Sequence, residues 1–157
     1  MIVLIILAED VDTGFLEKGL DLLGEYAIPF RIRYANARHD RSHLEEMLED
    51  FCSESGKIVI CLESSPSEVS DIVASSTEIP FLSILLEKEG LTGKTLSRKT
   101  LVRGVGIGER EFLKSVRLAA RIVGLIDPDI RQYCREDKLR EKAKIRELDR
   151  KHKMDHV

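Results

Sequence analysis

Short apolar runs alternate along the chain with segments in which apolar residues recur every three or four positions. Runs rich in β-branched residues predict buried strands, and the wider spacing predicts amphipathic helices. A helical pattern follows each of the first three strands and the last one, whereas the polar segment 87–100 has no recognisable pattern. The expected strands are 2–7, 30–35, 58–62, 81–86 and 101–107.

Alternation of strand and helix is the sequence signature of right-handed β-α-β units. The runs 2–7 and 58–62 are apolar at every position, which is typical of parallel strands covered on both faces. In 30–35, Arg31 and Arg33 alternate with apolar residues, which favours a place nearer the sheet edge. We therefore expect an α/β fold: a three-layer sandwich around a mostly parallel, doubly wound, flavodoxin-like sheet.

The C-terminal segment has a different pattern. A helix is expected from Asp127, with Pro128 in its first turn, but charges of both signs alternate from Tyr133 to Met154. Two interpretations stay open, a solvated and frayed tail or a helix that packs on a neighbouring subunit. The chain is divided accordingly into an α/β domain, 1–126, and a charged C-terminal helical extension, 127–157. The apolar residues that could form the contact are Ile130, Tyr133, Leu139, Ile145 and Leu148.

Composition narrows the class of partner. The chain has 157 residues, 43% of them hydrophobic, with a net charge of −3 at pH 7. This charge argues against general binding to nucleic acid or to anionic membranes, and no apolar run is long enough to span a bilayer. The three cysteines form no CxxC pair, so we expect reduced thiols in a cytoplasmic protein rather than a disulfide framework or a zinc site.

Three polar loops follow the first three strands, and ligands of such sheets bind outside the carboxyl ends of the strands. The first loop carries Glu9, Asp10 and Asp12. These carboxylates either cap the next helix or contact hydroxyl groups or an amine of a ligand. An acidic loop repels phosphate unless a cation compensates for it.

The second loop, 36–41, holds the richest chemistry. Arg38 and Arg41 could clamp an anion, and His39 is either a solvated side chain or a proton carrier near neutral pH. In the third loop, 63–68, the hydroxyls of Ser64 and Ser65 either hold an anion at a helix N-terminus or serve as helix caps. The sequence shows no metal-ligand spacing and no nucleophilic triad, so neither a metal site nor a triad is expected.

These loops together resemble the PurE family of purine biosynthesis, the aminoimidazole ribonucleotide carboxylases and carboxyaminoimidazole ribonucleotide mutases. Where a typical member reads G-S-x-S-D, this chain has Ala8-Glu9-Asp10-Val11-Asp12. The family's S-A-H-R-T-P and G-G-A-A-H-L-P-G stand at 36–41 and 64–71. The register runs without a gap from Ile2 to about Leu85, and 105–108 with the following helix resemble the family's last strand and helix.

The resemblance implies a PurE-like α/β sandwich that assembles as a homo-oligomer, an octamer in the family, with its C-terminal helix reaching a neighbour. It implies a small, phosphorylated, nucleotide-like ligand with an imidazole and no cofactor. Carried over to this chain, the ligand-binding residues are Glu9, Asp10, Asp12, Arg38, Arg41, Ser64 and Ser65.

The motif residues themselves differ from the family pattern. Arg38 replaces the proton-shuttling histidine and cannot act as a base, and His39 stands beside it as the candidate catalytic residue. Ser64 and Ser65 replace two glycines. We therefore expect a PurE-like protein whose standard activity, a carboxy-transfer mutase or carboxylase-like lyase reaction on an imidazole ribonucleotide, is altered or lost. The alternative is a non-catalytic, oligomeric relative that binds a nucleotide or an anion.

Overall fold

A computed structural model describes residues 3–8, 13–63, 68–85 and 109–154 of the chain. Within these residues, four strands form one sheet in the order β2-β1-β3-β4, and every neighbouring pair is parallel. This order is that of flavodoxin-like sheets, as predicted. The expected strand 101–107 and the segment 87–100 lie outside the described residues. The strands are β1 (Val3–Leu7), β2 (Phe30–Tyr34), β3 (Ile58–Glu63) and β4 (Phe81–Leu85).

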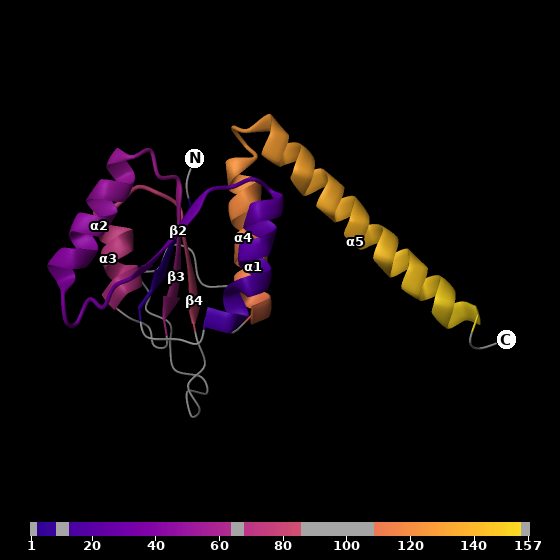
Figure 1. Cartoon of the computed structure of the whole chain (residues 1–157), viewed down its shortest axis with the longest axis horizontal. Helices are drawn as coiled ribbons and strands as arrows, with labels where there is room; N and C mark the ends of the chain where they lie inside the picture. Colours follow the sequence, from indigo (N-terminus) through magenta and orange to yellow (C-terminus); the bar gives the residue numbers. More distant parts are fainter. Residues whose placement is uncertain (1–2, 9–12, 64–67, 86–108, 155–157) are drawn as a thin grey trace, which may run out of the picture.

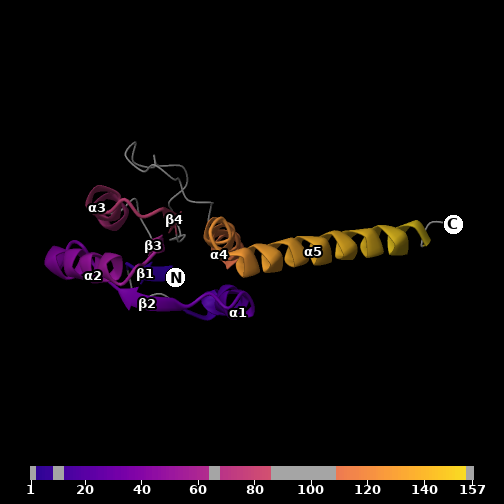
Figure 2. The same cartoon turned by 90° about the horizontal axis from the view of Figure 1, so that it is seen from above.

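Helices cover both faces of the sheet and make the three predicted layers. The helices α1 and α4 lie on one face, and α2 and α3 lie on the other (Figures 1 and 2). A short 3-10 helix, η1 (Thr13–Leu16), leads directly into α1. The α-helices are α1 (Glu17–Glu25), α2 (Arg41–Ser53), α3 (Glu68–Ser76), α4 (Glu109–Val123) and α5 (Pro128–Met154).

The two central strands have buried side chains on both faces. Val3, Ile5 and Leu7 of β1 pack with α1 and α4, whereas Leu4 and Ile6 pack with α2 and α3. Strand β3 alternates in the same way. Strand β2 lies at the edge, as the alternating arginines predicted.

The described ends of α2 follow local side-chain chemistry. The carboxylate of Asp40 accepts a hydrogen bond from the backbone N–H of His43, at 3.0 Å, and so caps the helix. The helix ends at Ser53, because Ser55 takes the left-handed conformation with φ 64°. Gly56 is covered by the ring of Phe51, and a Cβ there would lie 2.5 Å from ring atoms.

Helix α5 is continuous to Met154 and projects from the α/β body (Figures 1 and 2). Its described part is therefore helical rather than a frayed tail. The carboxylate of Asp127 starts it by accepting hydrogen bonds from the N–H groups of Asp129 and Ile130, at 3.0 and 3.2 Å. Past its root the helix carries three exposed apolar side chains, Leu139, Ile145 and Leu148.

A polar cluster fastens α5 to the body. The hydroxyl of Tyr26, at the end of α1, donates to Asp137 Oδ2 at 2.8 Å. Arg117 of α4 places Nε 3.3 Å from the same oxygen and Nη2 2.6 Å from Glu141 Oε1. Burial, followed by the hydrogen bond to the Asp137 carboxylate, raises the pKa of Tyr26 well above its ordinary value.

The raised pKa of Tyr26 makes stability depend on pH in alkaline solution. The folded chain holds the phenol proton more tightly than the unfolded chain, whose ordinary value is 10.0, so this stabilisation is complete below pH 10 and is lost as the pH rises further. We expect Tyr26→Phe to lower the free energy of unfolding by roughly 1–2 kcal/mol near pH 8, with the difference from wild type shrinking above about pH 10. Urea titrations at several pH values measure this difference.

The matched control is Tyr133→Phe, which changes an exposed tyrosine of α5 and should leave the wild-type pH profile unchanged. Parallel pH profiles for wild type and Tyr26→Phe would show that the Tyr26 phenol does not contribute in this way.

Candidate functional site

A cavity of about 240 Å³ opens at the carboxyl ends of β1 and β2, the edge at which the sequence predicted a site. Residues from the ends of both strands, from the turn that follows β2 and from the first turn of α2 form its wall. They are Leu7, Ala8, Tyr34, Ala35, Asn36, His39, Asp40 and His43.

Backbone hydrogen bonds hold the turn after β2 in place. The N–H of Ala35 donates to the carbonyl of Leu7 at 3.1 Å, which ties the start of the turn to β1. The carbonyl of Asn36 accepts from His39 and Asp40, at 3.1 and 2.9 Å, and its side-chain oxygen accepts from the N–H of Arg38 at 3.1 Å. The turn therefore presents His39 and Asp40 to the cavity from a backbone that is fixed at both ends.

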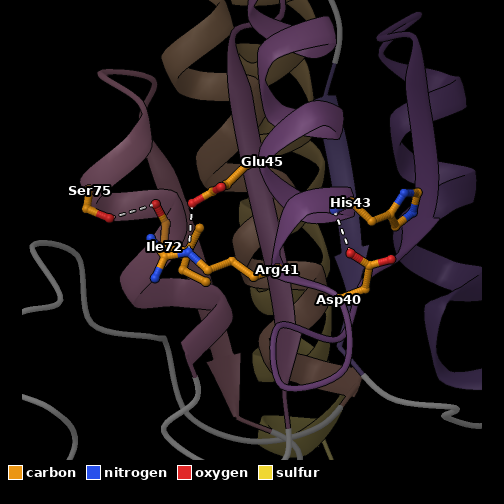
Figure 3. Close-up of polar contacts among 6 residues, drawn as sticks. All are labelled: Asp40, Arg41, His43, Glu45, Ile72 and Ser75. Carbon is orange, nitrogen blue, oxygen red and sulfur yellow. Dashed lines mark hydrogen bonds and ion pairs between the residues drawn. The ribbon is translucent and has the colours of Figure 1, made fainter.

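Two imidazoles share this cavity. His39 comes from the turn and His43 from the first turn of α2, and the carboxylate of Asp40 between them in sequence accepts from the backbone of His43 (Figure 3). All three side chains are exposed and within reach of a ligand. A neutral imidazole can accept a proton and its charged form can donate one, so the pair suits proton transfer.

Sequence reasoning missed His43 as a site residue because it lies on a helix rather than in a loop. The sequence feature that could have identified it is its position three residues after Asp40, which places it in the first turn of α2. The first turn of a helix that follows a strand lies beside the end of that strand, so its side chains can reach the same edge.

A larger cavity of about 490 Å³ adjoins the first, between β2 and α2, and shares Tyr34 and His43 with it. Arg33 brings a cation to its wall, and Glu46 and Asp50 of α2 bring carboxylates. Together the two cavities fall in the size range of small-molecule sites, which is about 300–1,000 Å³.

The two arginines of the turn do not line either cavity. The Nε of Arg41 lies 2.7 Å from Glu45 Oε1, and the side chain extends toward Ile72 and Ser75 of α3, on the side opposite His43 (Figure 3). Arg38 is exposed on the turn. The structure therefore does not bring them together as a clamp over the cavity. The other predicted site residues, Glu9, Asp10, Asp12, Ser64 and Ser65, lie outside the described residues.

Glu63 departs from its expected place in the third polar loop. It is the last residue of β3 and only 2% exposed. The hydroxyls of Ser70 on α3 and Ser83 on β4 donate to its Oε1, at 2.5 and 2.8 Å. A buried carboxylate is tolerated when hydrogen bonds replace its water, and these two link β3, α3 and β4 directly below the carboxyl edge.

Cys61 lies on the same face of β3, two residues before Glu63. Burial, followed by the charge of Glu63, raises the pKa of its thiol, which therefore stays protonated. A protonated and fully buried thiol is a core residue rather than a nucleophile.

Two further features are absent from the described ranges, a cluster of metal-ligating side chains and a membrane-spanning helix. No group of three or more His, Cys, Asp or Glu side chains there could hold a metal ion. No helix in that part of the chain is both long and apolar enough to cross a bilayer.

Comparison with solved structures identifies the fold. The chain is similar to the crystal structure of PurE from Treponema denticola, with a TM-score of 0.82 and 21% sequence identity over 96% of this chain and 97% of that one. No protein-family model matches the chain, and no curated protein matches its sequence. The PurE-like fold predicted from the sequence, including the C-terminal helical extension, is thus confirmed.

The buried cluster around Glu63 makes a testable contribution to stability. Ser83→Ala removes one of its two hydroxyl donors, and we expect a loss of roughly 1–3 kcal/mol in the free energy of unfolding, because part of a buried carboxylate is left unsatisfied. The matched control is Ser75→Ala on α3, whose hydroxyl bonds only the local carbonyl of Ile72, at 3.1 Å (Figure 3). Urea denaturation should show a clearly lower free energy of unfolding for Ser83→Ala than for Ser75→Ala. Equal losses in the two variants would contradict the stabilising role of the cluster.

Proposed function

We propose that the protein is a divergent PurE-like protein of purine nucleotide biosynthesis, in the carboxyaminoimidazole ribonucleotide mutase or carboxylase class, with its standard activity altered or lost. Its ligand would be a small phosphorylated nucleotide bound at the carboxyl edge of the sheet. The observation that carries the proposal is a cavity lined by His39, Asp40 and His43 at this edge of a PurE-like fold.

The reaction of this enzyme class needs a group that accepts a proton, and the two histidines of the cavity can supply it. Attaching a carboxyl group to an imidazole ring carbon requires that the proton on that carbon leave, and a base must accept it. Arg38, at the family's histidine position, stays charged and cannot do so. In our proposal His39 is the acid or base, and His43 from the same wall is the second proton carrier.

Ligand binding would combine several charges. Asp10 and Asp12 would contact hydroxyls, and cationic side chains such as Arg38 would attract the phosphate. Arg41 is a weaker candidate for a phosphate contact, because its side chain would first have to break the ion pair with Glu45. Ser64 and Ser65 add side chains where the family has glycines, so the ligand would approach the third loop less closely.

Turnover of carboxyaminoimidazole ribonucleotide, followed by absorbance, tests the enzymatic form of the proposal. If the chain is active, His39→Ala and His43→Ala should each reduce turnover about 100-fold or more, because general acid–base catalysis contributes at least that much. His152→Ala, which changes an exposed histidine of α5, should retain wild-type turnover. Activity that survives both cavity substitutions would reject the acid–base assignment.

The second candidate function is non-catalytic binding of a nucleotide or an anion. It is favoured by the replacement of the family's histidine with Arg38 and of its glycines with Ser64 and Ser65. Wild-type protein without turnover but with a melting temperature raised by the ribonucleotide would support this alternative. Neither turnover nor stabilisation would contradict both forms of the proposal.

The proposal includes a homo-oligomer, an octamer by resemblance to PurE, in which α5 packs on a neighbouring subunit. The apolar side chains that support it are Leu139, Ile145 and Leu148, which are 65%, 67% and 57% exposed on the projecting helix. Burying them against a second copy would remove this apolar area from water.

Light scattering tests the assembly. We expect the wild type to be larger than a monomer, and the double substitution Ile145→Glu and Leu148→Glu to yield smaller species, because a buried unpaired carboxylate is costly. Arg150→Glu alters charge on an exposed position of the same helix that does not face Ile145 or Leu148, and it should leave the assembly intact. A strictly monomeric wild type would contradict the proposed packing of α5.

A further inference from the structure

Four cationic side chains surround a cavity of about 390 Å³ at the elbow between α4 and α5. They are Arg121 from the last turn of α4, and Arg131, Arg135 and Lys138 from the first turns of α5. In Figure 1 this elbow lies at the opposite end of the α/β body from the turn between β2 and α2. We propose that the cavity is a second ligand site, which binds a small polyphosphorylated anion. This inference goes beyond the proposed function and does not depend on it.

Only one of these cations has an evident structural task. Arg131 donates from Nε to the carbonyl of Gly124 and from Nη2 to that of Leu125, each at 2.7 Å, and so caps the end of α4. Within the described ranges, Arg121, Arg135 and Lys138 form no ion pair with an acidic side chain. Their charges remain available to a ligand.

This concentration of charge works against the stability of the helix. Arg131 and Arg135 are four residues apart and Arg135 and Lys138 three apart, spacings at which like charges destabilise a helix. The nearby acids are occupied elsewhere, since Asp137 contacts Tyr26 and Arg117, and Glu136 accepts from Gln132. A bound polyanion would relieve the repulsion through charge-assisted hydrogen bonds.

The shape of the site favours a small ligand over a nucleic acid. The cations converge from two helices on one cavity, and its volume suits a small molecule. Leu125, 72% exposed, supplies an apolar wall beside them, and Cys134 supplies a half-buried thiol. The chain as a whole carries a net charge of −3, which opposes a long polyanion that would also follow the rest of the surface.

Titration calorimetry with inorganic tripolyphosphate at about 0.15 M salt tests the site, because at that salt weak surface attraction is screened. We expect one bound tripolyphosphate per chain and a loss of affinity of about tenfold or more in the double variant Arg135→Gln and Lys138→Gln, which removes two charged donors. The matched control is Lys142→Gln and Arg146→Gln, two cations further along α5 that do not line the cavity. This control should change the affinity by less than about twofold if local contacts dominate.

The double variant His39→Ala and His43→Ala separates this inference from the proposed function. It should retain tripolyphosphate binding, because its changes lie in the other cavity. Absence of binding in the wild type would overturn the proposal. Equal losses of affinity in the elbow variant and its control would also overturn it. If, in addition to these equal losses, single-stranded RNA binds more tightly than tripolyphosphate, the cations form an extended nucleic-acid surface instead.

Alkylation of Cys134 provides a local readout at the elbow. In a Cys52→Ser background, which removes the exposed thiol, maleimide labelling of Cys134 is followed by peptide mass spectrometry. Saturating tripolyphosphate should slow the labelling, and ATP should do so as well if the polyphosphate group is what the cations recognise. An unchanged rate in the presence of bound tripolyphosphate would place the anion elsewhere and overturn the assignment.

Discussion

The structure depends on two central strands that offer no side chain to water. Along β1 and most of β3 both faces are apolar and buried, so each face of the sheet must be covered by helices. Polar chemistry is thereby displaced to the ends of the strands, where the chain turns and helices begin. The one carboxylate that remains within β3, Glu63, is buried, and the hydroxyls of Ser70 and Ser83 take the place of water around it.

The same constraint explains what could be predicted from the sequence. Unbroken apolar runs identified the central strands, and alternating Arg31 and Arg33 identified the edge strand, because burial on one or two faces leaves a local pattern. The role of Glu63 left no such pattern, since its partners lie 7 and 20 residues away. The pairing of Arg41 with Glu45 follows a local spacing of four residues, but the direction of the Arg41 side chain toward α3 left no pattern in the sequence. His43 lines the cavity because the first turn of α2 lies beside the end of β2, and the spacing of residues in the sequence does not show how a helix is placed.

Fold and chemistry are preserved to different degrees in this chain. The TM-score of 0.82 to the Treponema denticola PurE at 21% identity shows that the packing tolerates extensive substitution. A proton-transfer site tolerates much less, because an arginine cannot replace a histidine as a base whatever its position. In the motif segments this sequence departs from the PurE pattern at several positions, among them Arg38, Ser64 and Ser65. The structural likeness therefore supports a fold here, whereas any function has to be argued from the side chains in the cavity.

The anchoring of α5 also determines how its charges are distributed. Asp137 faces Tyr26 and Arg117, and Glu141 faces Arg117, so these two acids of the helix are turned toward the body. Because successive residues of a helix point in different directions, fixing these acids also fixes the cations between them. Arg131, Arg135 and Lys138 are then left together at the elbow, where Asp137 cannot neutralise them while it holds the helix in place. The cationic cavity is thus a consequence of how the helix is attached, and it persists as long as that attachment does.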